Sequence, residues 1–500
     1  MPDVAHGASD SAGGTRTPHI NGSRSKGNCV ISSFSAPFAR GRGLVRLGAA
    51  TLVSGLVAAG VLAGAGTAAA AEVTHSQGGA TATIGGLKTY GAAVIHADTG
   101  DQQISAGLFE MSVEGGGTLQ TYCVDLYNPT QRDAKYRETP WSGTSLGANK
   151  DAGRIRWILQ NSYPQVNNLA SLADKAGIDG GLTEQDAATG TQVAIWRYSD
   201  GAAVDAVDPQ AEQLADYLQK TARVVAEPEA SLTLDASAVS GHQGEPLGPV
   251  TVHTNASDAT VTPPLDAATS GVRIVGKDSK VVTSVTDGTQ LFFDVPADSA
   301  DGSAELTVQA STTVPVGRAF TSESRSQTQI LAGSSESTVS ATASATWAKQ
   351  GAVPALSAAK NCAKTGVDIT AANQGDQDFT FELMGTTYAI PAGGSRTVTI
   401  PLQEDQAYDF TINGPQGDEN RFTGVLDCLT QADETTDLTT QTLSEPSPAT
   451  VGGTSTADTN LAATGGSSAT PLIAGTAIGL VVIGGAALLL VGRKENESRH

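Results

Sequence analysis

The chain has 500 residues and a formal net charge of −21, from 30 lysines and arginines against 51 aspartates and glutamates. A chain of this length exceeds one hydrophobic core and predicts about two to four domains. A negative surface repels phosphate groups and anionic lipid, so we expect neither nucleic acid nor a lipid surface as a partner. The low charged fraction of 16%, with abundant alanine, glycine, serine and threonine, favours extracellular β-rich modules joined by flexible spacers.

The N-terminal region has the pattern of an export signal. Basic residues from Arg40 to Arg46 precede an apolar run over 47–63, and a stretch of small residues ends at Ala71. This order is typical of a secretory signal peptide. We therefore expect residues 1–71 to be a leader and signal peptide cleaved after Ala71, with an uncleaved N-terminal anchor as the alternative.

Residues 72–226 combine strand and helix patterns, which predicts an α+β domain. Alternating apolar and polar residues over 80–84 and 119–124 indicate strands. Helical spacing follows in three places. The first helix has Ile155, Ile158 and Leu159 on one face and ends before Pro164. The second is capped by Thr183, with Asp186 three residues later. The third follows Pro209 and has an apolar face made of Ala211, Leu214, Tyr217 and Leu218.

The following residues lack strong helical patterns and predict all-β modules. Short β-type runs separated by turn residues over 227–350 suggest an immunoglobulin-like sandwich. Residues 351–430 repeat this pattern on a smaller scale and predict a small β-sandwich. Residues 431–460 are rich in threonine, serine and acidic residues, which is typical of an extended, solvated spacer.

The C-terminal region, residues 461–500, has three adjoining parts. The apolar segment from Pro471 to Val491 is long enough to span a hydrocarbon core of about 30 Å as a transmembrane helix. Arg493 and Lys494 follow it and favour a cytoplasmic end. Just before the apolar segment stands the sequence Leu461-Ala462-Ala463-Thr464-Gly465.

This arrangement resembles a sortase sorting signal of the LPxTG class. Ala462 replaces the usual proline, and an LAxTG version is familiar from Gram-positive actinobacteria of high GC content. The resemblance implies that a sortase cuts between Thr464 and Gly465 and joins Thr464 to cell-wall peptidoglycan, so that the chain is in the membrane only before sorting. An ordinary C-terminal membrane anchor is the alternative.

The four cysteines of the chain are divided unevenly among its regions. Cys29 lies in the leader, whereas Cys362 and Cys428 bracket the small β module. Export to an oxidising exterior makes a disulfide between these two the simplest expectation, and closing such a loop stabilises a fold by roughly 4 kcal/mol in the chain-entropy model. Cys123 is then left over, which in a secreted protein indicates intermolecular pairing, a reactive thiol or another covalent fate.

Cys123 lies in the sequence Thr121-Tyr122-Cys123-Val124-Asp125, and a later helix carries Thr191-Gln192-Val193-Ala194-Ile195-Trp196. Together these segments resemble the thioester domains of Gram-positive surface proteins, which are named for their TQxA motif. The resemblance covers residues 72–226. It implies that the Cys123 sulfur and the Gln192 side chain form an internal thioester, with Tyr122, Asp125, Thr191, Ala194 and Trp196 as neighbours from the motifs.

The resemblance also implies an adhesin-like function, and no constellation of residues in the sequence points to an enzyme. Attack of Cys123 on the Gln192 amide would expel ammonia, and an amine on a partner could later attack the thioester and become covalently joined. We therefore expect a secreted, wall-anchored protein that captures an amine-bearing ligand. The alternative is a structural surface protein that binds reversibly through its β modules and has no reactive thioester. The seven histidines show no metal-ligand spacing, so we expect neither a metal nor a cofactor.

Overall fold

The computed structural model describes residues 78–98, 100–324, 326–415, 417 and 419–429. The expected signal peptide, spacer and sorting signal lie outside these described residues. Within the part of the chain that is described, no helix combines the length and the apolar character needed to cross a membrane.

The N-terminal part contains a seven-stranded sheet in the order β2-β3-β15-β14-β4-β1-β5. Its neighbouring strands are all antiparallel. The expected strands over 80–84 and 119–124 are confirmed as parts of β1 and β3. The strands are β1 Thr81–Ala97, β2 Gly100–Val113, β3 Thr118–Cys123, β4 Lys135–Thr139, β5 Val204–Ala206, β14 Ala319–Ser322 and β15 Gln329–Ser334.

Two strands of this sheet come from far along the sequence. The β14–β15 hairpin belongs to the region 227–350, which the sequence assigned to the sandwich. In the structure β15 pairs with β3, placing Gln329 opposite Cys123, and β14 pairs with β4. The expected division after residue 226 therefore does not hold for this hairpin. Without it, β3 and β4 would each present an unpaired edge, which a sheet avoids.

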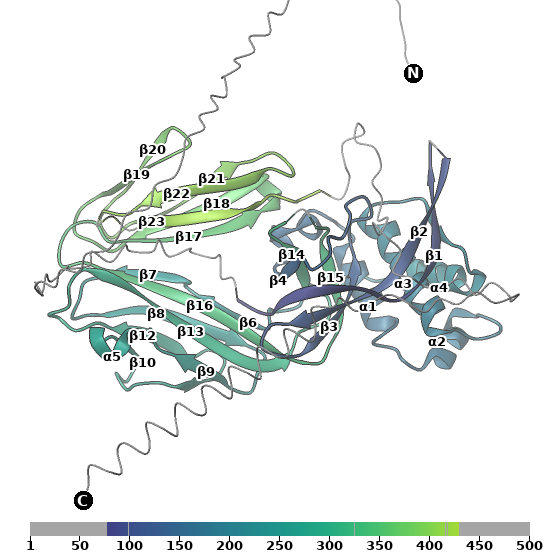
Figure 1. Cartoon of the computed structure of the whole chain (residues 1–500), viewed down its shortest axis with the longest axis horizontal. Helices are drawn as coiled ribbons and strands as arrows, with labels where there is room; N and C mark the ends of the chain where they lie inside the picture. Colours follow the sequence, from purple (N-terminus) through teal and green to yellow (C-terminus); the bar gives the residue numbers. More distant parts are fainter. Residues whose placement is uncertain (1–77, 99, 325, 416, 418, 430–500) are drawn as a thin grey trace, which may run out of the picture. The chain divides into compact units, whose positions relative to one another are not determined.

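Four helices accompany the sheet and lie together beside β1 and β2 in Figure 1. The three expected helices are confirmed, and α2 is an additional one. The central helix α3 begins at the predicted capping box, in which Asp186 N–H donates to Thr183 Oγ1 at 3.1 Å and Thr183 N–H donates to Asp186 at 2.9 Å. The helices are α1 Ala152–Asn161, α2 Leu169–Ala176, α3 Glu184–Ser199 and α4 Pro209–Thr221.

Helix α3 lies at the centre of this domain. It contacts α1 and α4 as well as β1, β2 and β3, and residues 187–196 are all buried. Gly190 allows α4 to approach closely, because a Cβ at this position would lie only 2.4 Å from the Ala211 carbonyl oxygen. The glycine weakens the isolated helix, and the close packing against α4 compensates for that loss.

The expected sandwich is formed by a four-stranded sheet, β10-β12-β8-β6, and a five-stranded sheet, β11-β9-β13-β16-β7. Buried residues of both sheets belong to one apolar cluster that continues into the N-terminal domain. The long β13 and β16 pair along their whole lengths, and β14 and β15 lie between them in sequence. The elements are β6 Leu232–Asp235, β7 Ala238–Gly241, β8 Pro246–Thr254, β9 Ala259–Thr262, α5 Ala267–Ser270, β10 Arg273–Val275, β11 Ser284–Val285, β12 Gln290–Asp294, β13 Gly302–Thr313 and β16 Glu336–Trp347.

A buried ion pair links β4 of the N-terminal sheet to the start of the β14–β15 hairpin. Arg318, just before β14, donates from Nε to Glu138 Oε1 on β4 at 2.8 Å, and both side chains are at most 5% exposed. The same carboxylate accepts the backbone N–H groups of Ala80 and Ser231 at 3.2 and 2.9 Å. The charge of Glu138 is thus satisfied by groups from the N-terminal sheet, the start of the sandwich and the inserted hairpin.

The third module has its own apolar cluster. The expected disulfide is confirmed, because Cys362 and Cys428 are bonded and their Cα atoms lie 5.2 Å apart. The strands are β17 Pro354–Asn361, β18 Gly366–Asn373, β19 Phe379–Leu383, β20 Thr386–Ile390, β21 Ser395–Pro401, β22 Ala407–Asn413 and β23 Glu419–Val425.

The shared sheet predicts that residues 72–226 do not fold independently. A fragment with this range lacks β14 and β15, so β3 loses one hydrogen-bonded neighbour and the apolar core is opened. We expect it to show no cooperative thermal transition by circular dichroism, whereas a fragment spanning 72–350 should unfold cooperatively. Equal melting temperatures for the two fragments would contradict this account.

Because the ion pair between Arg318 and Glu138 is buried, we expect Arg318→Met to lower the free energy of unfolding strongly. Removing the guanidinium leaves the buried Glu138 carboxylate without its charge partner, which should lower the free energy of unfolding by about 3–5 kcal/mol in urea titrations. Arg421→Met is the matched control, because it breaks an exposed ion pair with Asp409 and should cost less than about 1 kcal/mol. Similar, small losses in both variants would refute the role given to Arg318.

Candidate functional site

The structure brings the predicted pair, Cys123 and Gln192, together. Cys123 is the last residue of β3, with β2 on one side and β15 on the other. Gln192 lies near the middle of α3. Both residues are buried, with 1% and 0% of their surface exposed. The site is therefore enclosed within the domain core.

Two hydrogen bonds hold the Gln192 amide against Cys123. The Cys123 backbone N–H donates to Gln192 Oε1 at 2.9 Å, and Gln192 Nε2 donates to the Cys123 carbonyl oxygen at 2.9 Å. The Gln192 amide thus pairs with the Cys123 backbone as the peptide group of a neighbouring strand would. The residue that holds the amide is also the residue whose sulfur would attack it. Such placement of two reacting groups supplies much of the advantage of an intramolecular reaction.

Gln329 is a site residue that the sequence analysis missed. Its Nε2 donates to the Cys123 sulfur at 3.3 Å, and its Oε1 accepts a hydrogen bond from Thr121 Oγ1 at 3.0 Å. The second bond fixes which end of the amide faces the sulfur. An N–H group at this position stabilises a thiolate relative to a thiol, and the thiolate is the reactive form of cysteine.

Tyr122 and Thr191 attach the motifs to the surrounding chain. The Tyr122 hydroxyl donates to the Tyr163 carbonyl oxygen at 2.9 Å, and burial raises its pKa. Thr191 Oγ1 donates to the Ala187 carbonyl oxygen at 2.6 Å and contacts Ser162 Oγ at 2.5 Å. Both residues thereby connect the Cys123 strand and the Gln192 helix to the segment that follows α1.

Asp125 fixes the turn directly after Cys123. It is 1% exposed and accepts the Asn128 backbone N–H at 3.3 Å. Burial, and next the nearby Asp200 carboxylate, raise the pKa of Asp125 well above its usual range. Asp200, just after α3, accepts the Leu126 backbone N–H at 3.2 Å. The turn after Cys123 is thus bound to the end of the helix that carries Gln192.

Ala194 and Trp196 complete the helical motif and are both fully buried. They therefore form part of the core beside Gln192. The remaining motif residues from the sequence analysis, Leu461 to Gly465 of the expected sorting signal, lie outside the described residues.

One acidic group in the third module has the geometry of a possible cation site. Carboxylate oxygens of Glu404, Asp405 and Asp427 lie within 4.8 Å of one another. Burial raises the pKa of Asp427 to about 7, against the opposing effect of Lys360. A carboxyl that keeps its proton to near neutral pH beside a lysine is a poor cation ligand. We assign no metal to this group.

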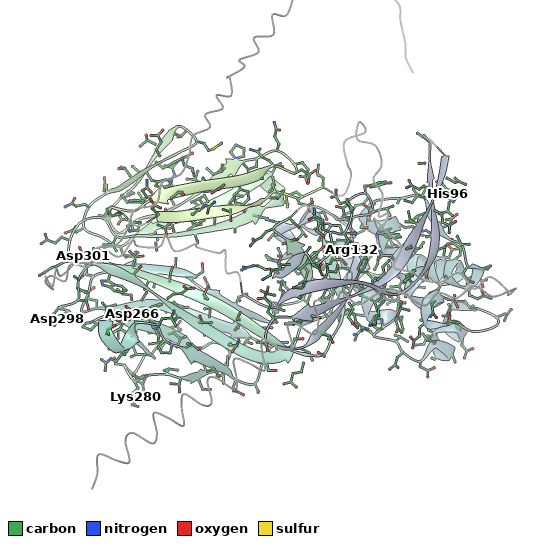
Figure 2. All side chains as sticks on the ribbon, in the orientation of Figure 1. His96, Arg132, Asp266, Lys280, Asp298 and Asp301 are labelled. Carbon is green, nitrogen blue, oxygen red and sulfur yellow. A yellow bond between two sulfur atoms is a disulfide. The ribbon has the colours of Figure 1, made fainter. Side chains whose placement is uncertain are left out.

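His96 has acidic neighbours and lies towards the end of the β1–β2 hairpin (Figure 2). Its Nδ1 contacts Asp101 at 2.8 Å and its Nε2 contacts Asp205 at 3.1 Å. The side-chain hydrogen bond with Asp101, and next that with Asp205, raise the pKa of His96. These exposed contacts join the hairpin to β5, and we assign them no catalytic role.

Comparison with known proteins supports the interpretation of the Cys123–Gln192 pair. Two family models match the chain, namely the thioester domain over residues 120–224 and the C-terminal domain of bacterial phospholipase C over residues 352–425. Among curated proteins, no relative matches the chain.

Structural comparison gives three distant likenesses. The Bacillus anthracis TIE protein is 16% identical with a TM-score of 0.25, over 69% of this chain and 75% of that chain. The thioester domain of the Enterococcus faecium TIE86 protein is 16% identical with a TM-score of 0.25, over 54% and 97%. The Escherichia coli chaperone DraB is 14% identical with a TM-score of 0.14, over 39% and 97%.

TM-scores of 0.25 and below carry no argument about fold or function. The family match, however, includes both Cys123 and Gln192, which the structure joins by hydrogen bonds. Residues 120–224 of this chain accordingly match the thioester-domain family in both the sequence and the placement of this pair.

Proposed function

We propose that Cys123 and Gln192 form an internal thioester that captures an amine group on a partner covalently, in the manner of an adhesin. The observation that carries this proposal is the paired hydrogen bonding of the Gln192 amide to the Cys123 backbone, at 2.9 Å for each bond. The family match over residues 120–224 supports the same chemistry.

Formation of the thioester needs no external reagent. The Cys123 sulfur attacks Cδ of Gln192, the bond from Cδ to Nε2 breaks, and ammonia leaves with the thiol proton. The Cys123 backbone N–H, already bonded to Oε1, stabilises the negative charge that develops on this oxygen. The Gln329 N–H at the sulfur favours the thiolate that attacks.

Capture of a partner reverses the role of the sulfur. An amine attacks Cδ, a new amide bond forms, and the bond from Cδ to sulfur breaks. The amine proton passes to the departing sulfur, which becomes a thiol again. Because the site is almost fully buried, water is excluded and hydrolysis is suppressed. Access for an amine then requires local opening of the structure around β3 and α3.

We further propose that the protein is exported and anchored to the wall of a Gram-positive bacterium. The sequence supports this through the signal-like residues before Ala71, the motif from Leu461 to Gly465, the apolar segment after it and the basic residues that follow. Each site would act once and remain joined to its ligand, so we classify the protein as a binding protein rather than an enzyme. The partners are peptidoglycan, through Thr464, and a ligand that presents an amine.

If the thioester forms, the measured mass of the exported chain should be lower, by the mass of one ammonia molecule, than the mass calculated from the sequence of the same residues. Methylamine should restore mass as a methylamide at Gln192 and expose one alkylatable thiol at Cys123. Cys123→Ala and Gln192→Ala should each abolish labelling, because each removes one half of the bond. Intact-mass spectrometry before and after methylamine measures this.

The control for these variants is Gln213→Ala on α4, an exposed glutamine that should leave labelling unchanged. Full sequence mass in the wild type, or labelling that persists without Cys123, would refute the thioester.

The anchoring proposal predicts the fate of a Thr464→Ala, Gly465→Ala variant. Without the scissile pair, sortase has no bond to cut, and the protein should be extracted by detergent together with the membrane. The wild type should be released only by enzymes that digest the wall. If wild type and variant are distributed equally between the two fractions, the chain is not sorted in this way.

A further inference from the structure

We propose that the indole N–H of Trp196 is a second hydrogen-bond donor to the acyl oxygen of Gln192 during formation and cleavage of the thioester. This inference rests on the proposed function, because the acyl oxygen acquires its negative charge only in that reaction. Trp196 would thus be a catalytic residue, while Cys123 and Gln192 form the bond itself.

The first observation is a donor without an acceptor. Trp196 is 0% exposed, and its Nε1 has no hydrogen-bond partner among the described residues. Leaving a buried donor unpaired is unfavourable, so buried tryptophans usually find a partner for this group. Trp141 illustrates the usual case, since its Nε1 donates to the Gly317 carbonyl oxygen at 2.8 Å.

The second observation is the position of Trp196 on α3. It follows Gln192 by four residues, and side chains with this spacing lie on the same face of a helix. Side chains on a helix also lean towards its N-terminus, so the indole covers the turn that carries Gln192. Both residues are fully buried. This spacing places the indole ring over the helical turn that carries Gln192, within the same buried core.

The chemistry of the site creates a need for such a donor. In the unreacted state Gln192 Oε1 accepts from the Cys123 backbone, and Nε2 is held by the Cys123 carbonyl. When ammonia leaves, the second of these bonds is lost. The acyl oxygen can accept two hydrogen bonds, and tetrahedral intermediates place a full negative charge on it. A second, fixed donor stabilises that charge in a site that water does not reach.

If Trp196 had a purely structural role, the expected effect of removing its N–H on the rate of amine capture would be different. If the indole served only to fill the core, removing its N–H would relieve an unpaired donor and leave the rate of amine capture unchanged. If it is an oxyanion donor, the rate should fall while the fold persists. The thioester carbonyl should also vibrate at a higher frequency, because a hydrogen bond to its oxygen is lost.

The experiment compares the full-length chain with its Trp196→Phe and Trp141→Phe variants. The rate of methylamine incorporation, the infrared carbonyl band of the thioester and the melting temperature are measured for each. We expect Trp196→Phe to react about 100-fold more slowly, the usual effect of removing one oxyanion donor, with its carbonyl band shifted upwards. Trp141→Phe loses a satisfied hydrogen bond, so it should lose stability but retain the wild-type rate and band.

Two outcomes separate the claims. A wild-type chain at full sequence mass would overturn the thioester itself and this inference with it. A wild-type thioester with an unchanged rate and band in Trp196→Phe would overturn only the role of Trp196. If Trp196→Phe fails to fold, benzothienylalanine at position 196 keeps the ring shape and removes only the N–H, and the same rate and band decide the question.

Discussion

The paired hydrogen bonds between the Gln192 amide and the Cys123 backbone are the interaction on which the rest of the structure depends. They require a helix and a strand end to meet in a fixed register, with both partners buried. An error of about 1 Å would remove most of the advantage of intramolecular attack. The capping box of α3, the close approach of α4 at Gly190 and the turn held by Asp200 all restrict the position of the helix.

The position of β3, the strand that carries Cys123, is restricted as well, but by residues that are remote in sequence. β15 lies beside β3 and supplies Gln329 to the Cys123 sulfur, and Arg318 near the base of the same hairpin neutralises the buried Glu138. The region of the sandwich therefore contributes to the N-terminal domain, since its inserted hairpin completes the seven-stranded sheet. Under the proposed function, a buried site of this kind would protect the thioester from water until a partner amine gains access.

The sequence predicted those features whose causes are local. Thr183 and Asp186 predicted the start of α3, and the motifs around Cys123 and Gln192 predicted the two residues that the structure joins by hydrogen bonds. The odd number of cysteines after the expected signal peptide separated Cys123 from the disulfide. Gln329 was not predicted from the sequence, because its role depends on the pairing of β15 with β3, and Cys123 on β3 lies 206 residues earlier. No local pattern distinguishes a strand that completes a distant sheet from one that stays in its own module, so the boundary after residue 226 was misplaced for the β14–β15 hairpin.

The central claim is that one bond joins Cys123 to Gln192, and peptide mapping after reaction with isotope-labelled methylamine tests it most directly. Each labelled Gln192 should be accompanied by one newly alkylatable Cys123, in equal molar amounts, with no label at other glutamines. Label at another residue, or a Cys123 that is alkylated before the amine is added while Gln192 keeps its ordinary amide, would contradict it.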